Sequence, residues 1–301
     1  MVKLFLSLLF VFSIVHAEDT LGNSGFASEF NNGDVKASVK EINPVLEQLD
    51  MKIKSLLDEA TYTKNEAYIN IIFSPKSDFI INDRVDSVKV VQTLKDNGLL
   101  NLYFKKPQQL RINFHTSDNP TFFVKIMGDA LRNMGYYRYV TKESKLNETG
   151  FIWSITLKAE YVTDPQVLQK ELDNSGSKIV DVTRHTQTEW TFSVDMRDAF
   201  LAVEMLYDGE RVELNRSLYS YWLDVSGIEK LKIESSYRNS WYPYITYFDS
   251  SLHLLKVVKK DTKRRAMYLS IPQNAKYIKI SDIYTLKNIK DSLYLTPIGE
   301  K

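Results

Sequence analysis

The sequence predicts an α+β protein with two tandem ferredoxin-like βαββαβ units, followed by a small all-β sandwich or jelly roll. Three observations lead to this prediction. Helical and strand-like hydrophobic periodicities alternate between residues 67 and 214. The order of these elements occurs twice in succession. After Asn215 the helical pattern disappears, and seven short strand-like runs follow with turn residues between them.

The composition is that of an ordinary globular protein. Of the 301 residues, 44% are apolar and 26% are charged, which excludes a wholly disordered chain, a collagen and a multi-pass membrane protein. Lys plus Arg number 39 and Asp plus Glu number 38, so the whole chain has no electrostatic drive toward nucleic acid or an anionic membrane. The chain has no cysteine, which excludes disulfides, thiolate metal sites and a cysteine nucleophile.

The first 17 residues have the pattern of a secretory signal peptide. Lys3 precedes the apolar run Leu4–Val15, and Ala17 ends a small-residue cleavage pattern. This run is shorter than the roughly 20 residues that a membrane-spanning helix needs. We therefore expect cleavage before Glu18, with no transmembrane span in the mature chain; the alternative is an uncleaved anchor or a buried helix. Export without any cysteine favours the bacterial periplasm.

Residues 18–43 and the start of the next domain differ sharply in composition. Residues 18–43 are polar and rich in Asn, Gly and Ser, so we expect a flexible leader. Asn43-Pro44 is a typical N-cap and first helical position, and apolar residues recur at helical spacing to about Ala60. This amphipathic helix either packs on the domain that follows or serves in self-association.

The first ferredoxin-like unit is expected within residues 44–145. Its two helices have clear signals: Asp83 is a candidate N-cap with Gly98 at the end, and Asn119-Pro120 starts the second helix, which Gly135 ends. The expected strands are 67–73, 99–104, 109–115 and 136–140, in the order β-α-β-β-α-β.

The second unit, residues 146–215, repeats that order. Asp164-Pro165 starts a helix that Gly176 ends, and a second helix is expected over 196–206 with Gly209 after it. The two closing glycines are 37 residues apart in the first unit and 33 in the second, which supports a duplication. The expected strands are 151–162, 178–183, 188–194 and 210–214.

Residues 216–301 are predicted to form the sandwich, because short strands follow one another without helical periodicity. No linker-like segment separates the three parts, so we expect them to pack closely. The expected strands are 219–225, 230–235, 242–248, 252–258, 265–271, 277–280 and 293–296.

Motifs that would indicate catalysis are absent from the sequence. There is no HExxH, no G-x-S-x-G, no P-loop and no G-x-G-x-x-G. His115, His185 and His253 remain after the signal peptide and fall in three different units. We therefore predict no catalytic residues, no metal site and no cofactor.

The richest local signal is a group of aromatic residues next to a group of basic ones. Nine aromatic residues occur between Tyr219 and Phe248, against 12% in the whole chain. They are the core of the sandwich, a protein contact or a surface for stacking on glycans. The basic group is either a solvated hairpin tip or a contact for an acidic partner. The candidate partner- or glycan-binding residues are Trp241, Tyr242, Tyr244, Tyr247, Lys259, Lys260, Lys263, Arg264 and Arg265.

Strand alternation divides the aromatic residues between two faces. Trp241, Ile245 and Tyr247 are expected on one face, and Tyr242, Tyr244 and Phe248 on the other.

Asn215 is a candidate glycosylation site. It lies in Glu213-Leu214-Asn215-Arg216-Ser217, which fits the acidic-x-Asn-x-Ser/Thr pattern of some bacterial N-glycosylation systems. Asn147 fits only the shorter N-x-[ST] pattern.

The order of elements resembles the small α+β modules of bacterial envelope machines: outer-membrane assembly proteins, secretion rings, and pilus or flagellar accessory proteins. The resemblance covers about 150 residues and carries no residue-level motif, so it implies a fold and no site. We expect a non-enzymatic periplasmic adaptor or scaffold of an envelope assembly of flagellar, secretion or pilus type, such as a flagellar motor accessory protein. Its partners would be other periplasmic or envelope proteins. The alternatives are a module that binds peptidoglycan or another glycan, and a hydrolase with an unrecognised site.

Overall fold

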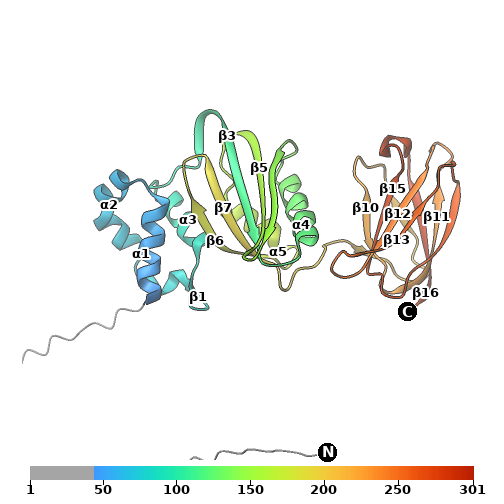
Figure 1. Ribbon diagram of the computed structural model, residues 1–301, viewed down its shortest axis with the longest axis horizontal. Helices are drawn as coiled ribbons and strands as arrows, with labels where there is room; N and C mark the ends of the chain where they lie inside the picture. Colours follow the sequence, from blue (N-terminus) through green and yellow to red (C-terminus); the bar gives the residue numbers. More distant parts are fainter. Residues whose placement is uncertain (1–43) are drawn as a thin grey trace, which may run out of the picture. The chain divides into compact units, whose positions relative to one another are not determined.

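The computed structural model describes residues 44–301, which belong to one compact unit (Figure 1). The expected signal peptide, the leader and the N-cap Asn43 lie outside the described residues. The described chain has helices and mixed sheets in its N-terminal part and largely β-sheets in its C-terminal part, with no closed barrel. This confirms the α+β class.

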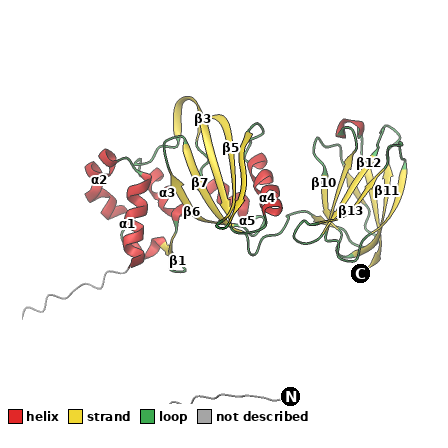
Figure 2. Cartoon of the chain, viewed as in Figure 1, coloured by secondary structure: helices red, strands yellow, loops and turns green. Residues whose placement is uncertain are grey.

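Helices begin where short polar side chains cap them. Asn119 accepts hydrogen bonds from the backbone N–H groups of Thr121 and Phe122, and Asp164 accepts one from Gln166, as expected. At the third helix Asp86 caps, in place of the expected Asp83. The helices are α1 Pro44–Leu56, α2 Glu59–Ile72, α3 Ser87–Asp96, α4 Pro120–Asn133 and α5 Pro165–Asp173, with 3-10 turns η1 Lys76–Phe79 and η2 Leu286–Asn288 (Figure 2).

Two expected elements of the tandem units are wrong. Residues 67–73 are not a strand: residues 67–72 belong to α2 and Phe73 is its C-cap. This helix starts where the Asp58 side chain accepts a hydrogen bond from Thr61 N–H at 2.9 Å. Residues 196–206 form no helix, because their backbone groups bond to other parts of the chain. Phe200 N–H donates to the Ser175 carbonyl at 2.9 Å, and Leu201 N–H donates to the Tyr277 hydroxyl at 3.3 Å.

One five-stranded sheet replaces the two expected units. The strand order is β4-β5-β3-β7-β6, with β3 parallel to β7 and all other neighbours antiparallel. Strands expected in different units thus pair directly, and the expected boundary between residues 145 and 146 falls inside β4. The bounds are β3 Tyr103–Thr116, β4 Val140–Asn147, β5 Gly150–Tyr161, β6 Lys178–Arg184 and β7 Glu189–Asp195, with a separate hairpin of β1 Ile80–Ile81 and β2 Arg84–Val85.

Several strands also differ from their expected bounds. The expected strands 99–104 and 109–115 are largely one long strand, β3, whose pairing with β5 is irregular between Tyr103 and Gln108. The strand expected at 136–140 starts only at Val140 and is β4.

The two faces of this sheet differ in polarity. On one face Ile112 lies opposite Ile155 and Phe114 opposite Trp153, and helices α4 and α5 pack over these buried residues (Figure 1). On the other face Arg111 forms ion pairs with Glu143 and Glu189. The apolar stripe of α1 also packs into this core, so the helix packs on the domain that follows it, which is the first of the two expected roles.

The C-terminal part consists of two sheets around a shared core. All seven strands expected there are present, although their bounds shift by a few residues. The sheet orders are β13-β12-β15-β10-β8 and β14-β11-β16-β9, and both sheets contribute to one cluster of buried apolar residues. The bounds are β8 Glu204–Met205, β9 Val212–Leu214, β10 Tyr221–Asp224, β11 Ile228–Ser235, β12 Pro243–Phe248, β13 Leu254–Lys259, β14 Ala266–Ser270, β15 Tyr277–Asp282 and β16 Leu293–Glu300.

Candidate partner-binding surface

Two of the aromatic candidate residues belong to the core of the sandwich. Trp241 and Tyr247 are fully buried, as is Ile245 between them. The Trp241 indole N–H also donates to the Ser281 carbonyl at 2.9 Å. The expected division of faces is therefore confirmed for this side of the strand. Because no partner can reach these two rings in the folded protein, they act in stability and not in binding.

The other two aromatic candidates lie on the outer face of the same sheet. Tyr242 is half-buried and packs edge-to-face against Tyr284, with ring centroids 5.1 Å apart. Tyr244 is exposed and lies directly opposite Lys259 on β13. The structure thus brings one aromatic and one basic candidate residue side by side on the outer face.

Strand β13 is an edge strand with exposed apolar side chains. It stands at the end of its sheet, with β12 as its neighbour on one side only. Leu254, Leu255 and Val257 are all exposed. In an antiparallel pair every second residue turns its N–H and C=O away from the neighbour, so the outer side of β13 offers backbone groups for another strand.

Strand β14 is an edge strand of the second sheet. It follows β13 in the chain, and no other helix or strand lies between the two. Its Tyr268 side chain is 73% exposed. We call β13, β14 and the chain between them the open side of the sandwich. The exposed apolar residues of β13 and Tyr268 were not among the candidate residues. The sequence did contain a signal for those of β13: in the run Leu254-Leu255-Lys256-Val257-Val258, apolar residues occupy positions on both faces of the strand, so some of them had to be exposed.

The basic candidate residues lie at the open side of the sandwich, with their charged groups exposed and not engaged in ion pairs. Lys259, Lys260, Lys263, Arg264 and Arg265 are all exposed. Arg265 donates to the Ser236 carbonyl at 2.8 Å, and Lys263 lies 3.4 Å from the Ser240 hydroxyl. None of the five forms an ion pair with a residue in the range 44–301. An acidic partner would thus meet five uncompensated cations.

The candidate glycosylation site is sterically open. Asn215 is exposed just after β9, its carbonyl accepts a hydrogen bond from the Tyr221 hydroxyl at 2.8 Å, and its side-chain oxygen lies 3.5 Å from the Ser292 hydroxyl.

The three histidines lie apart, each with its own local partner. His115 contacts the Thr149 carbonyl, His185 the Thr191 hydroxyl and His253 the Asp249 carboxylate. No group of three His, Asp or Glu side chains among residues 44–301 is arranged to hold a metal ion. None of the helices in that range has the length and apolar character needed to cross a membrane.

Comparison with known proteins identifies no family for this chain. No model of a protein family, no curated protein and no solved structure matches the chain.

Proposed function

We propose that this chain is an exported, non-enzymatic adaptor of a bacterial envelope assembly, and that it binds an extended acidic segment of a partner protein at the open side of the sandwich. The observation that carries the proposal is the edge strand β13, which combines exposed Leu254, Leu255 and Val257 with unpaired basic residues. The signal-like pattern of residues 1–17 supports export to the periplasm.

Strand addition explains why the edge is built this way. Edge strands in soluble proteins are commonly blunted by lysines, by bulges, by proline or by a covering segment, because a bare edge promotes aggregation. Strand β13 has Lys256 and Lys259, and these positive charges repel a second copy of the edge but attract an acidic segment. Here β13 has no proline, and within residues 44–301 no strand pairs with its outer side. A partner strand would satisfy the backbone groups there, while acidic side chains would face the basic residues.

Site-specific photo-crosslinking in intact envelopes tests the docking site. A photoreactive residue at Leu255 should crosslink to one protein, whereas the same residue at Ile298 on β16 should not. These positions form a matched pair, because Leu255 is 40% and Ile298 37% exposed. The proposal predicts that the crosslinked peptide is acidic. Crosslinks at Ile298 alone, or sedimentation of the protein with purified peptidoglycan in place of a protein crosslink, would contradict it.

A proline variant tests strand addition itself. Lys260 N–H donates to the Pro243 carbonyl, so the regular alternation turns the N–H of Val257 to the outer side. Val257→Pro should therefore leave the fold intact, as judged by circular dichroism, and abolish the Leu255 crosslink. Val257→Thr is the control and should keep the crosslink. The double variant Lys259→Glu with Lys260→Glu should weaken binding mainly at low ionic strength.

A further inference from the structure

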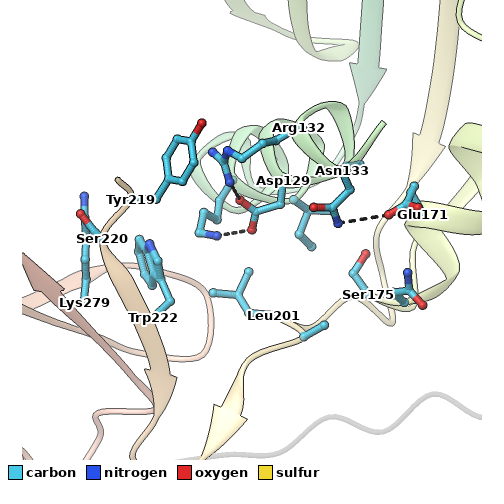
Figure 3. Close-up of a pocket in the computed structure, with 15 residues that line it drawn as sticks. Asp129, Arg132, Asn133, Glu171, Ser175, Leu201, Tyr219, Ser220, Trp222 and Lys279 are labelled. Atoms are coloured by element: carbon cyan, nitrogen blue, oxygen red, sulfur yellow. Dashed lines mark hydrogen bonds and ion pairs between the residues drawn. The ribbon is translucent and has the colours of Figure 1, made fainter. Parts of the chain in front are cut away.

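A second candidate site lies away from the open side of the sandwich. An open pocket of about 530 Å³ is lined by helix α4, the end of α5 with the residues after it, residues 201–202 and 219–220, and strands β10 and β15. Figure 3 shows Asp129 and Arg132 on the helix facing Trp222 and Tyr219, with Lys279 beside them. A volume of this size fits a ligand larger than a simple inorganic ion.

The cations of the pocket exceed its carboxylates. Lys125 and Arg132 both pair with the single carboxylate of Asp129, Arg132 at 2.8 Å. Lys279 is half-buried, and no carboxylate within residues 44–301 pairs with it. Burial lowers the pKa of Lys279, and the positive charge of Lys125 lowers it further. The folded protein therefore holds a partly desolvated ammonium group without a counter-ion, which costs free energy unless an anion binds.

Both lysines lie against one aromatic ring. The Nζ atoms of Lys125 and Lys279 are 5.0 and 5.6 Å from the ring centroid of Trp222. Phe248 stacks on Trp222 with centroids 5.1 Å apart and keeps this ring in place. An anionic group that enters the pocket would thus meet two ammonium groups at a rigid position.

The other end of the pocket is polar and suited to hydroxyl groups. Asn133 donates from its amide to the Glu171 carboxylate at 3.1 Å, as the dashed line in Figure 3 marks. The Asn133 amide can donate to and accept from sugar hydroxyls, and the Glu171 carboxylate can accept from them. The distribution of charge therefore runs from a cationic end at Lys279 to a hydrogen-bonding end at Asn133.

We propose that this pocket binds a carboxylate-bearing saccharide, with its carboxylate at Lys125 and Lys279 and its hydroxyls toward Asn133 and Glu171. This site is separate from the proposed protein-docking surface, since β13 and β14 contribute no residue to it. Either proposal therefore stands or fails alone.

Calorimetric titration of the mature chain tests the ligand class. N-acetylmuramic acid and glucuronic acid carry the carboxylate, N-acetylglucosamine lacks it, and inorganic phosphate is an anion without a sugar. We expect both acidic sugars to bind about tenfold or more tightly than the neutral sugar and than phosphate. Equal affinity for the neutral sugar, equal affinity for phosphate, or no heat from either acidic sugar would overturn the assignment.

Two lysine variants, one at β15 and one at the turn η2 that follows it, locate the site. Lys279→Gln should weaken binding of both acidic sugars about tenfold. Lys287→Gln, which removes an exposed charge outside the pocket, should leave binding unchanged. A second measurement does not depend on ligand: Lys279→Met should raise the melting temperature of the free protein, because it removes the uncompensated charge. Unchanged sugar binding in a folded Lys279→Gln protein would contradict the proposal.

Discussion

Lys52 on α1 and Asp181 on β6 form an ion pair, with 2.6 Å between Nζ and Oδ1. The hydroxyls of Ser87 and Thr183 also donate to the Asp181 carboxylate, at 2.8 and 3.0 Å. Lys52 donates in addition to the Val182 carbonyl at 3.2 Å. The edge strand β6 is thereby joined to the first helix and to the start of α3, which covers this edge of the sheet.

The Asp181 carboxylate should make stability depend on acid pH. Burial alone would raise its pKa, but the hydrogen bond and charge of Lys52 and the two hydroxyls lower the pKa below the ordinary value. The folded pKa is thus below the unfolded one, so the contribution is present above about pH 4 and is lost as pH falls through the folded pKa. Asp181→Asn should be less stable than wild type at neutral pH, and the difference should shrink toward pH 2.

Urea unfolding at a series of pH values measures this effect. The exposed Asp261→Asn is a suitable control and should follow the wild-type curve at every pH. An Asp181→Asn protein that loses as much free energy of unfolding in acid as wild type would show that other carboxylates carry the effect.

Tyr247→Phe should stabilise the protein. The Tyr247 hydroxyl is buried without a hydrogen-bond partner among residues 44–301, and burial raises the pKa of its phenol. Removing an unpaired buried hydroxyl should raise the free energy of unfolding by about 1 kcal/mol. The buried Tyr277 hydroxyl instead accepts from Leu201 N–H, so Tyr277→Phe should lower it by about 1 kcal/mol. Denaturant unfolding of both variants decides; equal changes in the two would contradict the assignment.

Gly176 and Gly98 form a matched pair at the ends of α5 and α3. Both have positive φ, +69° and +72°, but a Cβ on Gly176 would lie 2.6 Å from the Asp198 carbonyl oxygen, whereas one on Gly98 would meet open space. Gly98→Ala should cost only the left-handed conformation, about 1 kcal/mol. Gly176→Ala should cost clearly more, because backbone must move. Thermal unfolding of the two variants tests this, and similar melting temperatures would refute it.

Trp241 and Tyr244 should differ in what they contribute to stability. Trp241→Ala empties a fully buried site and removes the hydrogen bond to Ser281, so we expect a loss of about 3–5 kcal/mol. Tyr244→Ala changes an exposed side chain and should cost less than about 1 kcal/mol. Urea unfolding measures both. A large loss for Tyr244→Ala would place that ring in the core and remove it from the candidate surface.

Strand periodicity predicted much of the sandwich, because alternation depends on local backbone geometry alone. It placed Trp241 and Tyr247 on one face and Tyr244 on the other. Which face would be buried could not follow from alternation, since both carry aromatic residues. That outcome depends on the neighbours of β12, and these come from β13 and β15.

The two expected elements that the structure contradicts failed for different reasons. The run Ala67–Phe73 is apolar enough for either a strand or a helix, and a run this short does not distinguish the two. Residues 196–206 have helical spacing of their apolar residues. Their backbone N–H groups, however, donate hydrogen bonds to distant partners, the carbonyl of Ser175 and the hydroxyl of Tyr277. The pocket beside Trp222 was out of reach for the same reason, because its lysines, Lys125 and Lys279, are far apart in the chain.

The parallel pairing of β3 with β7 has a consequence for how the chain is made. Arg111 on β3 has its partner, Glu189, on β7. A nascent chain that ends anywhere before β7 therefore has a central strand with one side unpaired and its apolar residues incompletely covered. The pairing of β3 with β7 requires a contact between segments that are far apart in the sequence, and such contacts form slowly. The N-terminal part of the protein thus completes its folding only after synthesis has passed Asp195.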